Sequence, residues 1–161
     1  MNTLYVLSGP PAAKDRDFPL IKRFVSLDGK KAVCGSVTLG VFCRISGKTA
    51  GLKFVGSNAE EPPEYEVEGL DFASEGIITL NKCFEVLNAK GPACGIYFPA
   101  RKLARLMLEC DIIHFIEGSA INRLHDVKLF KKAGVLPRSQ IIDKIIKKLE
   151  SAGKIAIKEI V

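Results

Sequence analysis

The sequence predicts an α/β fold: a mostly parallel sheet with helices on both faces, a three-layer sandwich forming a single domain over residues 1–161. Short β-rich runs alternate along the chain with longer segments whose apolar residues recur at three- and four-residue spacing. Parallel neighbours need crossover connections, and these pack as right-handed βαβ units on the sheet faces. With 47% hydrophobic residues, the chain is also large enough for one buried core.

The first predicted strand covers residues 3–8, because Pro10 and the residue after it cannot continue a central strand. Residues 15–26 carry apolar side chains at helical spacing, and Pro19 fits a helix only in its first turn. Residues 31–34 form the second predicted strand. This start predicts a βα unit with short connections.

A short helix is expected next, with Ser36 as its N-cap and its end near Gly47. Its predicted buried side consists of Val37, Val41, Phe42 and Ile45. A strand is expected at residues 52–55. Residues 57–68 are rich in acid and proline and predict an exposed loop, whose part 61–68 approaches the site from above.

The second half repeats the alternation of helices and strands. The segment 69–90 is mixed in period and predicts a helix most clearly over residues 79–87. A stronger helix is expected over 99–110, followed by a strand over 112–116. The last helix covers 138–151, and a closing strand runs over 154–161.

Two strands run into a glycine and a serine. Gly35 and Ser36 follow the second strand, with Thr38 close behind, and backbone N–H groups at that helix start suit a phosphate or a carboxylate. Only one glycine is present, so neither a P-loop nor a dinucleotide fingerprint is matched. Tight strand-to-helix packing without a ligand is the alternative interpretation.

The second turn contains Glu117, Gly118, Ser119 and Asn122. The serine and asparagine offer hydrogen bonds to a polar ligand, while the glutamate accepts one or acts as a base. A conformationally demanding turn would use the same residues for its own backbone. In a parallel sheet both turns lie at the carboxyl edge, where α/β proteins bind ligands, and we place the candidate site there.

The histidines and cysteines give weaker signals. His114 lies inside an apolar strand and is expected to be a core or sheet-face histidine rather than a ligand, whereas His125 lies in a polar loop. A Cys34–His125 nucleophilic pair is conceivable, because a helix N-terminus favours a thiolate. The five cysteines include no CxxC pair, which predicts buried free thiols in a reducing compartment and no metal site. They are Cys34, Cys43, Cys83, Cys94 and Cys110.

The net charge of +6 is spread along the chain, and Lys30 and Lys31 precede their strand at the edge opposite the site. A solvated surface is expected rather than nucleic-acid binding, because no aromatics are interleaved with a basic stripe. No apolar run approaches the roughly 20 residues of a membrane helix, and the N-terminus has no signal-peptide pattern. We therefore expect a cytoplasmic protein with no membrane partner and no cofactor.

Several short motifs occur in a specific order: Leu7-Ser8-Gly9-Pro10-Pro11, residues 28–35, Pro62-Pro63 with residues 67–71 and 75–80, residues 113–115, and residues 118–122. In this order and spacing, the chain resembles the segment that follows the catalytic domain in a subgroup of stage II sporulation protein E family serine/threonine phosphatases. The likeness spans almost the whole chain. The family's first glycine turn reads Cys-Gly-Gly-Thr-Thr-Ala, and here Ser36 and Val37 replace its second glycine and first threonine.

The resemblance implies an accessory domain of a larger phosphatase, or a stand-alone copy of it. The family's metal-dependent centre is built from aspartates in a separate upstream domain, so the resemblance assigns no catalytic residue here. Three functions stay open. They are a non-catalytic regulatory domain that binds an anionic small molecule, a small transferase or isomerase using Glu117 or His125, and a docking module for a phosphatase catalytic domain or another protein.

Overall fold

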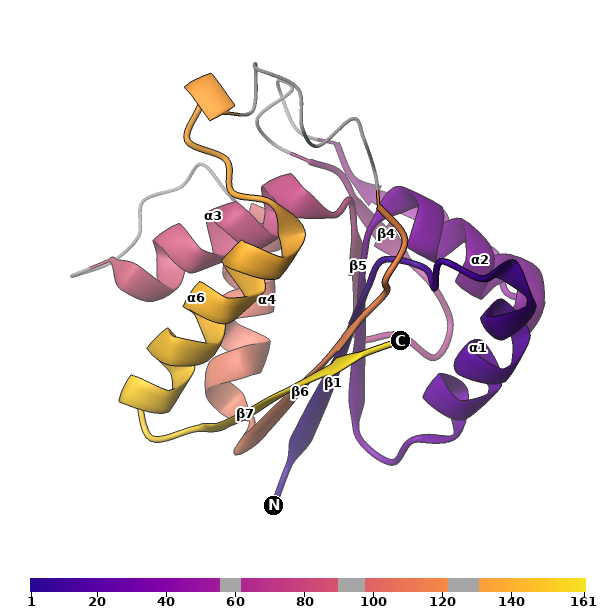
Figure 1. Cartoon of the computed structure of the whole chain (residues 1–161), viewed down its shortest axis with the longest axis horizontal. Coiled ribbons are helices and arrows are strands. Elements are labelled where there is room, and N and C mark those ends of the chain that lie inside the picture. Colours follow the sequence, from indigo (N-terminus) through magenta and orange to yellow (C-terminus); the bar gives the residue numbers. More distant parts are fainter. Residues whose placement is uncertain (56–61, 90–97, 122–130) are drawn as a thin grey trace.

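The structure is a computed structural model that describes residues 1–55, 62–89, 98–121 and 131–161. Its strands are β1 (Thr3–Ser8), β2 (Lys30–Cys34), β3 (Gly51–Phe54), β4 (Glu64–Glu66), β5 (Phe72–Ser74), β6 (Ile112–Glu117) and β7 (Ile155–Ile160). Its helices are the 3₁₀ turn η1 (Lys14–Arg16), α1 (Asp17–Ser26), α2 (Ser36–Ser46), α3 (Ile77–Asn88), α4 (Phe98–Glu109) and α6 (Arg138–Ser151). Figure 1 shows helices on both sides of the sheet.

The seven strands form one sheet in the order β3-β4-β5-β2-β1-β6-β7. The five strands from β5 to β7 are parallel to their neighbours, while β4 is antiparallel to both β5 and β3. The predicted α/β fold with a mostly parallel sheet is therefore confirmed. The antiparallel β3–β4 hairpin at one edge is the part that the alternation of helices and strands did not predict.

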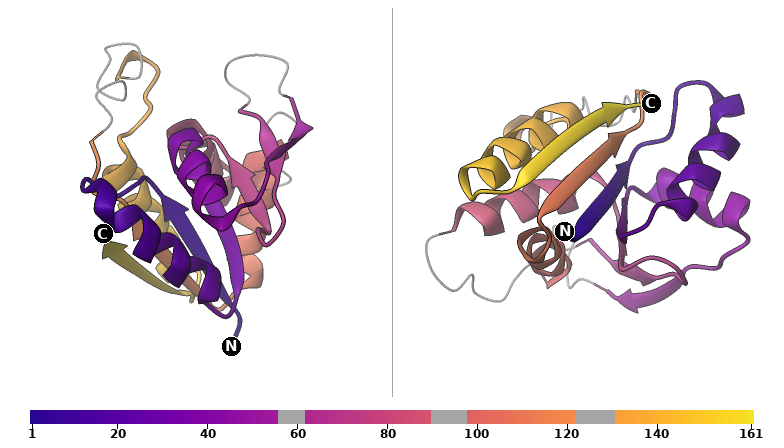
Figure 2. Two further views of the ribbon diagram at one scale, coloured as in Figure 1. Left: turned by 90° about the vertical axis from the view of Figure 1, so that its right-hand side faces the viewer. Right: turned by 90° about the horizontal axis from the view of Figure 1, so that it is seen from below.

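The core has two parts, one on each face of the sheet. On one face, α1 and α2 bury Ile21, Phe24 and Phe42 against the strands. On the other face, α3, α4 and α6 supply residues such as Leu103 and Ile145. The two views of Figure 2 show these layers on either side of the sheet. The apolar spacing of each helix therefore determines which side of it faces the sheet.

The strand order creates a topological switch point between β1 and β6, where the connections that follow two neighbouring strands lie on opposite faces of the sheet. The chain leaves β1 for α1 on one face, and it leaves β6 for α6 on the other face (Figure 1). In parallel α/β sheets a crevice opens at such a point, outside the carboxyl ends of the two strands. Residue pairing runs from Thr3↔Ile112 to Ser8↔Glu117, so the two strands end side by side.

Most predicted elements are confirmed within a residue or two. The first strand and the last helix have the predicted bounds. Pro19 lies in the first turn of α1, where a missing N–H costs no helical hydrogen bond. Gly47 ends α2 with a φ of 71°, as its C-cap role requires.

The prediction of a loop over residues 57–68 is wrong in part. Residues 56–61 lie outside the described part of the chain, but Glu64–Glu66 form β4. The adjoining strand β5, Phe72–Ser74, was also missed. Each strand is only three residues long, which is too short to show the period-two alternation by which strands are found.

The prediction that Ser36 caps α2 is also wrong. Gly35 is the N-cap, Ser36 is the first helical residue, and no side chain caps this end among the described residues. Val37, predicted to be buried, is 59% exposed, and the buried residues are Thr38, Leu39 and Phe42. The helix therefore begins one residue earlier than a Ser36 cap implies, and the first residue on its buried side is Thr38.

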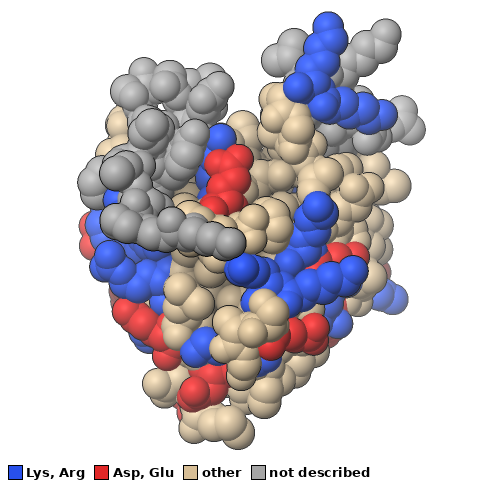
Figure 3. Space-filling view, turned by 90° about the vertical axis from the view of Figure 1, so that its left-hand side faces the viewer, with Lys and Arg blue, Asp and Glu red and all other residues tan. Residues whose placement is uncertain are grey.

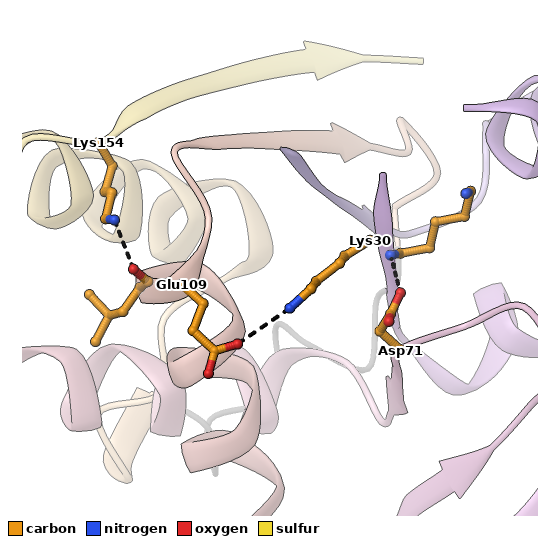
Figure 4. A network of polar contacts seen from close by, with 6 residues as sticks. Lys30, Asp71, Glu109 and Lys154 are labelled. Atoms are coloured by element: carbon orange, nitrogen blue, oxygen red, sulfur yellow. Dashed lines mark hydrogen bonds and ion pairs between the residues drawn. The ribbon is translucent and has the colours of Figure 1, made fainter. Parts of the chain in front are cut away.

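Polar contacts close the amino edge of the sheet, opposite the glycine turns. Figure 4 shows Lys30 reaching Glu109, with 3.3 Å between the Lys30 Nζ and the carboxylate oxygen. The backbone N–H of Lys31 donates to Asp71 Oδ2 at 2.8 Å, and Lys154 Nζ donates to the carbonyl of Leu108 at 2.7 Å. Lys30 and Lys31 therefore lie at the predicted edge, and both take part in these contacts.

Basic and acidic side chains are mixed on the surface. Figure 3 shows Lys and Arg interspersed with Asp and Glu on the face that includes α3 and α6. Examples elsewhere are the ion pairs of Arg23 with Glu159 and of Lys48 with Glu68. Such mixing agrees with the predicted solvated surface.

Candidate functional site

The two predicted glycine turns both lie at the carboxyl edge of the sheet. Gly35 follows β2 and Gly118 follows β6, and β1 ends between these strands at Ser8. The backbone N–H of Gly118 donates to the Ser8 carbonyl at 2.9 Å. The structure therefore brings the second turn against the end of β1, as the parallel order predicts.

The first turn is fixed by its contacts with neighbouring strands. Gly35 has a φ of 143°, and its N–H donates to the carbonyl of Ser74 at the end of β5 at 2.9 Å. A Cβ atom on Gly35 would lie 2.8 Å from Thr38 Oγ1, so a side chain does not fit. Thr38 is buried and accepts the Gly9 N–H at 2.9 Å. This hydrogen bond therefore joins the start of α2 to the residue directly after β1.

Two helix starts lie side by side at this turn. Gly76 is the N-cap of α3, and a Cβ on it would lie 3.3 Å from the Gly35 Cα. Among the described residues no side chain caps α2 or α3, and neither first turn contains an acidic residue. Ser36 is exposed at the start of α2. The positive ends of two helix dipoles are thus adjacent at one sheet edge.

The second turn bonds mainly to the loop after β1. A Cβ on Gly118 would collide with the carbonyl oxygens of Gly9 and Pro10. The Ser119 hydroxyl accepts the N–H of Ala12 at 3.1 Å, and the Ser119 N–H donates to the carbonyl of Val161 at 2.7 Å. These contacts support the alternative interpretation, in which the turn residues serve their own backbone.

Glu117 is buried and faces a lysine. Its Oε2 atom lies 3.5 Å from Lys158 Nζ, which also contacts Asp143 at 2.6 Å. The hydrogen bond to Asp143 is the main cause that raises the pKa of Lys158 above its ordinary value. Burial opposes this shift, and the nearby charge of Glu117 supports it. The ion pair with Lys158 therefore holds Glu117 in place. The neighbouring Ser8 hydroxyl is buried and has no hydrogen-bond partner among the described residues.

Sequence reasoning missed one residue of this edge, Arg138 at the start of α6. Its Nη1 donates to the carbonyls of Gly118 and Ala120 at 3.2 and 3.3 Å, and it packs against Gly9, where a Cβ would collide with it. Burial lowers the pKa of Arg138, and the negative charge of Glu117 opposes that shift. A cation at a helix N-terminus opposes the helix dipole, and this was the available sequence signal.

The remaining predicted site residues fall into two groups. Asn122 and His125 lie outside the described residues. Cys34 is fully buried, and burial raises the pKa of its thiol to about 12. A helix N-terminus was expected to lower that pKa, so the Cys34 half of the proposed nucleophilic pair is contradicted. The side chain lies among the core residues under α3 and α4, so desolvation determines the shift.

The placement of His114 and the free state of four of the cysteines agree with the expectations, but one of these thiols is not buried. His114 lies on the sheet face, with Nε2 3.2 Å from Glu159 Oε2 and its ring 5.6 Å from that of Tyr5. Cys34, Cys43, Cys83 and Cys110 are free, and all but Cys43 are buried. Cys94 lies outside the described residues.

Within the described ranges no cluster of three or more His, Cys, Asp and Glu side chains could hold a metal ion. No helix in the same part of the chain is long and apolar enough to span a membrane. No family model, curated protein or solved structure matches this chain.

Proposed function

We propose that this chain is a non-catalytic regulatory domain that binds an anionic small molecule at the carboxyl edge of its sheet. The observation that supports this function is the pair of adjacent, uncapped helix starts at Gly35 and Gly76. Unsatisfied N–H groups and the dipole together favour an anion at a helix N-terminus. Ser36 is exposed beside them and adds a hydroxyl donor.

The binding site in this proposal is smaller than the sequence suggested. Gly35 and Ser36 remain in it, while Thr38 supports the turn through its bond to Gly9. The segment from Glu117 to Ser119 supports the site by holding the β1 and β6 loops together. Glu75 is exposed directly before Gly76, the N-cap of α3. Its negative charge repels an anion and so limits the affinity of the site.

The proposed regulatory role extends to a phosphatase. The order of short motifs that resembles the stage II sporulation protein E family supports an accessory role beside a phosphatase catalytic domain. The free thiols of the described cysteines support a reducing, cytoplasmic location. In this role the bound anion would report a metabolic state to the catalytic domain.

A thermal-shift screen with orthophosphate, nucleoside monophosphates and sugar monophosphates tests the binding. A ligand at a hundred times its dissociation constant adds about 2.7 kcal/mol of stability, which raises Tm by several degrees for a chain of this size. We expect Ser36→Asp, which places a carboxylate in the first turn of α2, to abolish the shift, and Glu75→Gln to increase it.

The matched control is Asn88→Asp, which adds the same charge at the exposed end of α3, distant from the site. This variant should keep the full shift. A flat screen, or an equal loss of the shift in Ser36→Asp and Asn88→Asp, would contradict the proposal. Turnover of a phosphorylated metabolite that disappears in Glu117→Gln would instead support the transferase or isomerase alternative.

A docking module is the second candidate, because part of the sheet is not covered by helices. Ile155 and Ile157 of the edge strand β7 are 50% and 44% exposed. They share the α1 face with Glu159, which Arg23 of α1 contacts at 2.7 Å. We propose a second copy of the chain as the occupant. Light scattering should then show a dimer that Ile157→Lys dissociates, and a monomer at all concentrations would contradict this candidate.

A further inference from the structure

A basic pocket lies between the β3–β4 hairpin and α4, at the end of the sheet away from the switch point. Its volume is about 460 Å³, which is within the range of small-molecule sites. The pocket is lined by Lys53, Phe54, Glu64, Arg101, Lys102 and Arg105. The lining includes none of Gly35, Ser36 and Gly76, so the pocket is distinct from the two helix starts of the site proposed above.

One carboxylate is shared by two of the four cations. Glu64 has a side chain that is 9% exposed, and its Oε1 lies 2.6 Å from Lys102 Nζ and 3.9 Å from Lys53 Nζ. Burial lowers the pKa of Lys102, but the hydrogen bond and the charge of Glu64 outweigh that effect and raise it. Both lysines therefore pair with this carboxylate at the pocket wall.

The two arginines have no such partner. Arg101 and Arg105 are four residues apart on α4, and this spacing places their side chains next to each other on one face of the helix. Neither makes an ion pair with any residue of the described ranges. With four cations and one carboxylate, the lining carries a net charge of +3. An uncompensated charge of this size in a concave site attracts an anion of several charges.

We propose that this pocket binds a small molecule that carries two linked phosphate groups. A guanidinium offers a planar pair of donors that matches a phosphate, and two guanidiniums one turn apart can each take one phosphate of a linked pair. The lysines supply further point charges, and Phe54 forms an apolar wall. A diphosphate group therefore matches both the charge and the spacing of the lining, whereas a single phosphate would engage one arginine.

Calorimetric titration with inorganic pyrophosphate and with orthophosphate tests this pocket. We expect pyrophosphate to bind at least tenfold more tightly than orthophosphate at 0.15 M salt, where surface charges are largely screened (about 8 Å Debye length). The variant Arg101→Gln/Arg105→Gln should weaken pyrophosphate binding by at least tenfold. Arg101→Lys/Arg105→Lys keeps the charge but loses the paired donors. Its affinity for pyrophosphate should therefore lie between that of the unmodified chain and that of Arg101→Gln/Arg105→Gln.

The charge control is Lys144→Gln/Lys148→Gln, which removes two cations one turn apart on α6. Its affinity for pyrophosphate should stay within twofold of that of the unmodified chain. A loss equal to that of the arginine variant would show that only net charge matters, and would contradict the proposal. Ser36→Asp separates the two proposals, because it should leave pyrophosphate binding unchanged. Absence of pyrophosphate binding, or binding abolished by Ser36→Asp but not by the arginine variant, would overturn the inference. Circular dichroism verifies that each variant is folded.

Discussion

Thr38 and Gly9 connect the first turn of α2 to the exit of β1. Thr38 Oγ1 accepts the buried N–H of Gly9 at 2.9 Å, so the two segments are in direct contact. Gly9 also packs against Arg138 at the start of α6. Through these two contacts the loop after β1 joins a helix from each face of the sheet.

Replacing Thr38 with valine should destabilise the fold. The substitution keeps the shape of the side chain but leaves the buried Gly9 N–H without an acceptor, which costs about 1–3 kcal/mol. Urea denaturation measures this loss. Thr49→Val, at an exposed position, should change the free energy of unfolding by less than about 0.5 kcal/mol. Equal stability of the two variants would show that the Gly9 N–H has another acceptor.

Gly118→Ala should be costly for a different reason. Its methyl group would collide with the carbonyls of Gly9 and Pro10, so the two loops must separate and weaken their hydrogen bonds. We expect a loss of about 1–3 kcal/mol or more, as for other overpacked sites.

Gly40→Ala is the matched control, because a Cβ at this helical position meets no atom within 4 Å. It should stabilise the chain by about 0.5–1 kcal/mol through helix propensity. A Gly118→Ala protein as stable as the unmodified chain would mean that the β1 and β6 loops are not packed together in solution.

Asn81→Leu should loosen the segment before α6. The Asn81 amide donates to the carbonyl of Leu136 at 3.0 Å and accepts the Leu136 N–H at 2.9 Å. Loss of both bonds leaves two partly buried backbone groups unpaired, at a cost of roughly 1–3 kcal/mol. Hydrogen exchange at the Leu136 amide should accelerate. Unchanged exchange at that amide would refute the role assigned to Asn81, and Asn88→Leu at the exposed end of α3 serves as the control.

The Cys34 thiol predicts a loss of stability at alkaline pH. Its pKa is raised by burial from 9.0 to about 12 in the folded chain. Below pH 9 the thiol is protonated in both states and its contribution is fully present. Between pH 9 and 12 only the unfolded state ionises, so the free energy of unfolding falls by up to about 1.4 kcal/mol per pH unit.

Urea denaturation at pH 8 to 11 under reducing conditions measures this slope. Cys34→Val removes the thiol from the same core position, so the variant should have a shallower slope than the unmodified chain. Identical slopes would mean that Cys34 ionises equally in both states. The same burial should protect Cys34 from alkylation at pH 8 while the less buried Cys43 reacts, which mass spectrometry detects.

The elements with long periodic patterns could be predicted from the sequence. The 138–151 helix has isoleucines at three- and four-residue spacing, and its bounds agree with those of α6. The strands β4 and β5 could not be found, because a three-residue strand shows no period and is stabilised by its neighbours in the sheet. The direction of β4 depends on those tertiary contacts as well.

The position of the two glycine turns at one sheet edge was predicted, but their contacts were not. The parallel order of the strands correctly brings the turns after Cys34 and Glu117 to one edge. The contacts of Gly118 with Gly9 and Pro10 could not be predicted, because they join loops more than a hundred residues apart. The basic pocket was missed for a similar reason, since its cations come from β3 and α4 and each resembles a solvated surface residue when read alone.

The central position of β1 has a consequence for biosynthesis. Residues Thr3–Ser8 leave the ribosome before the other strands of the sheet and can pair with β2 early, but their other edge must wait for Ile112–Glu117. During that interval a buried, apolar strand has one open row of backbone donors and acceptors, which is a template for unwanted pairing. The nascent chain is therefore most vulnerable to aggregation while its first half is complete and β6 has not yet been translated.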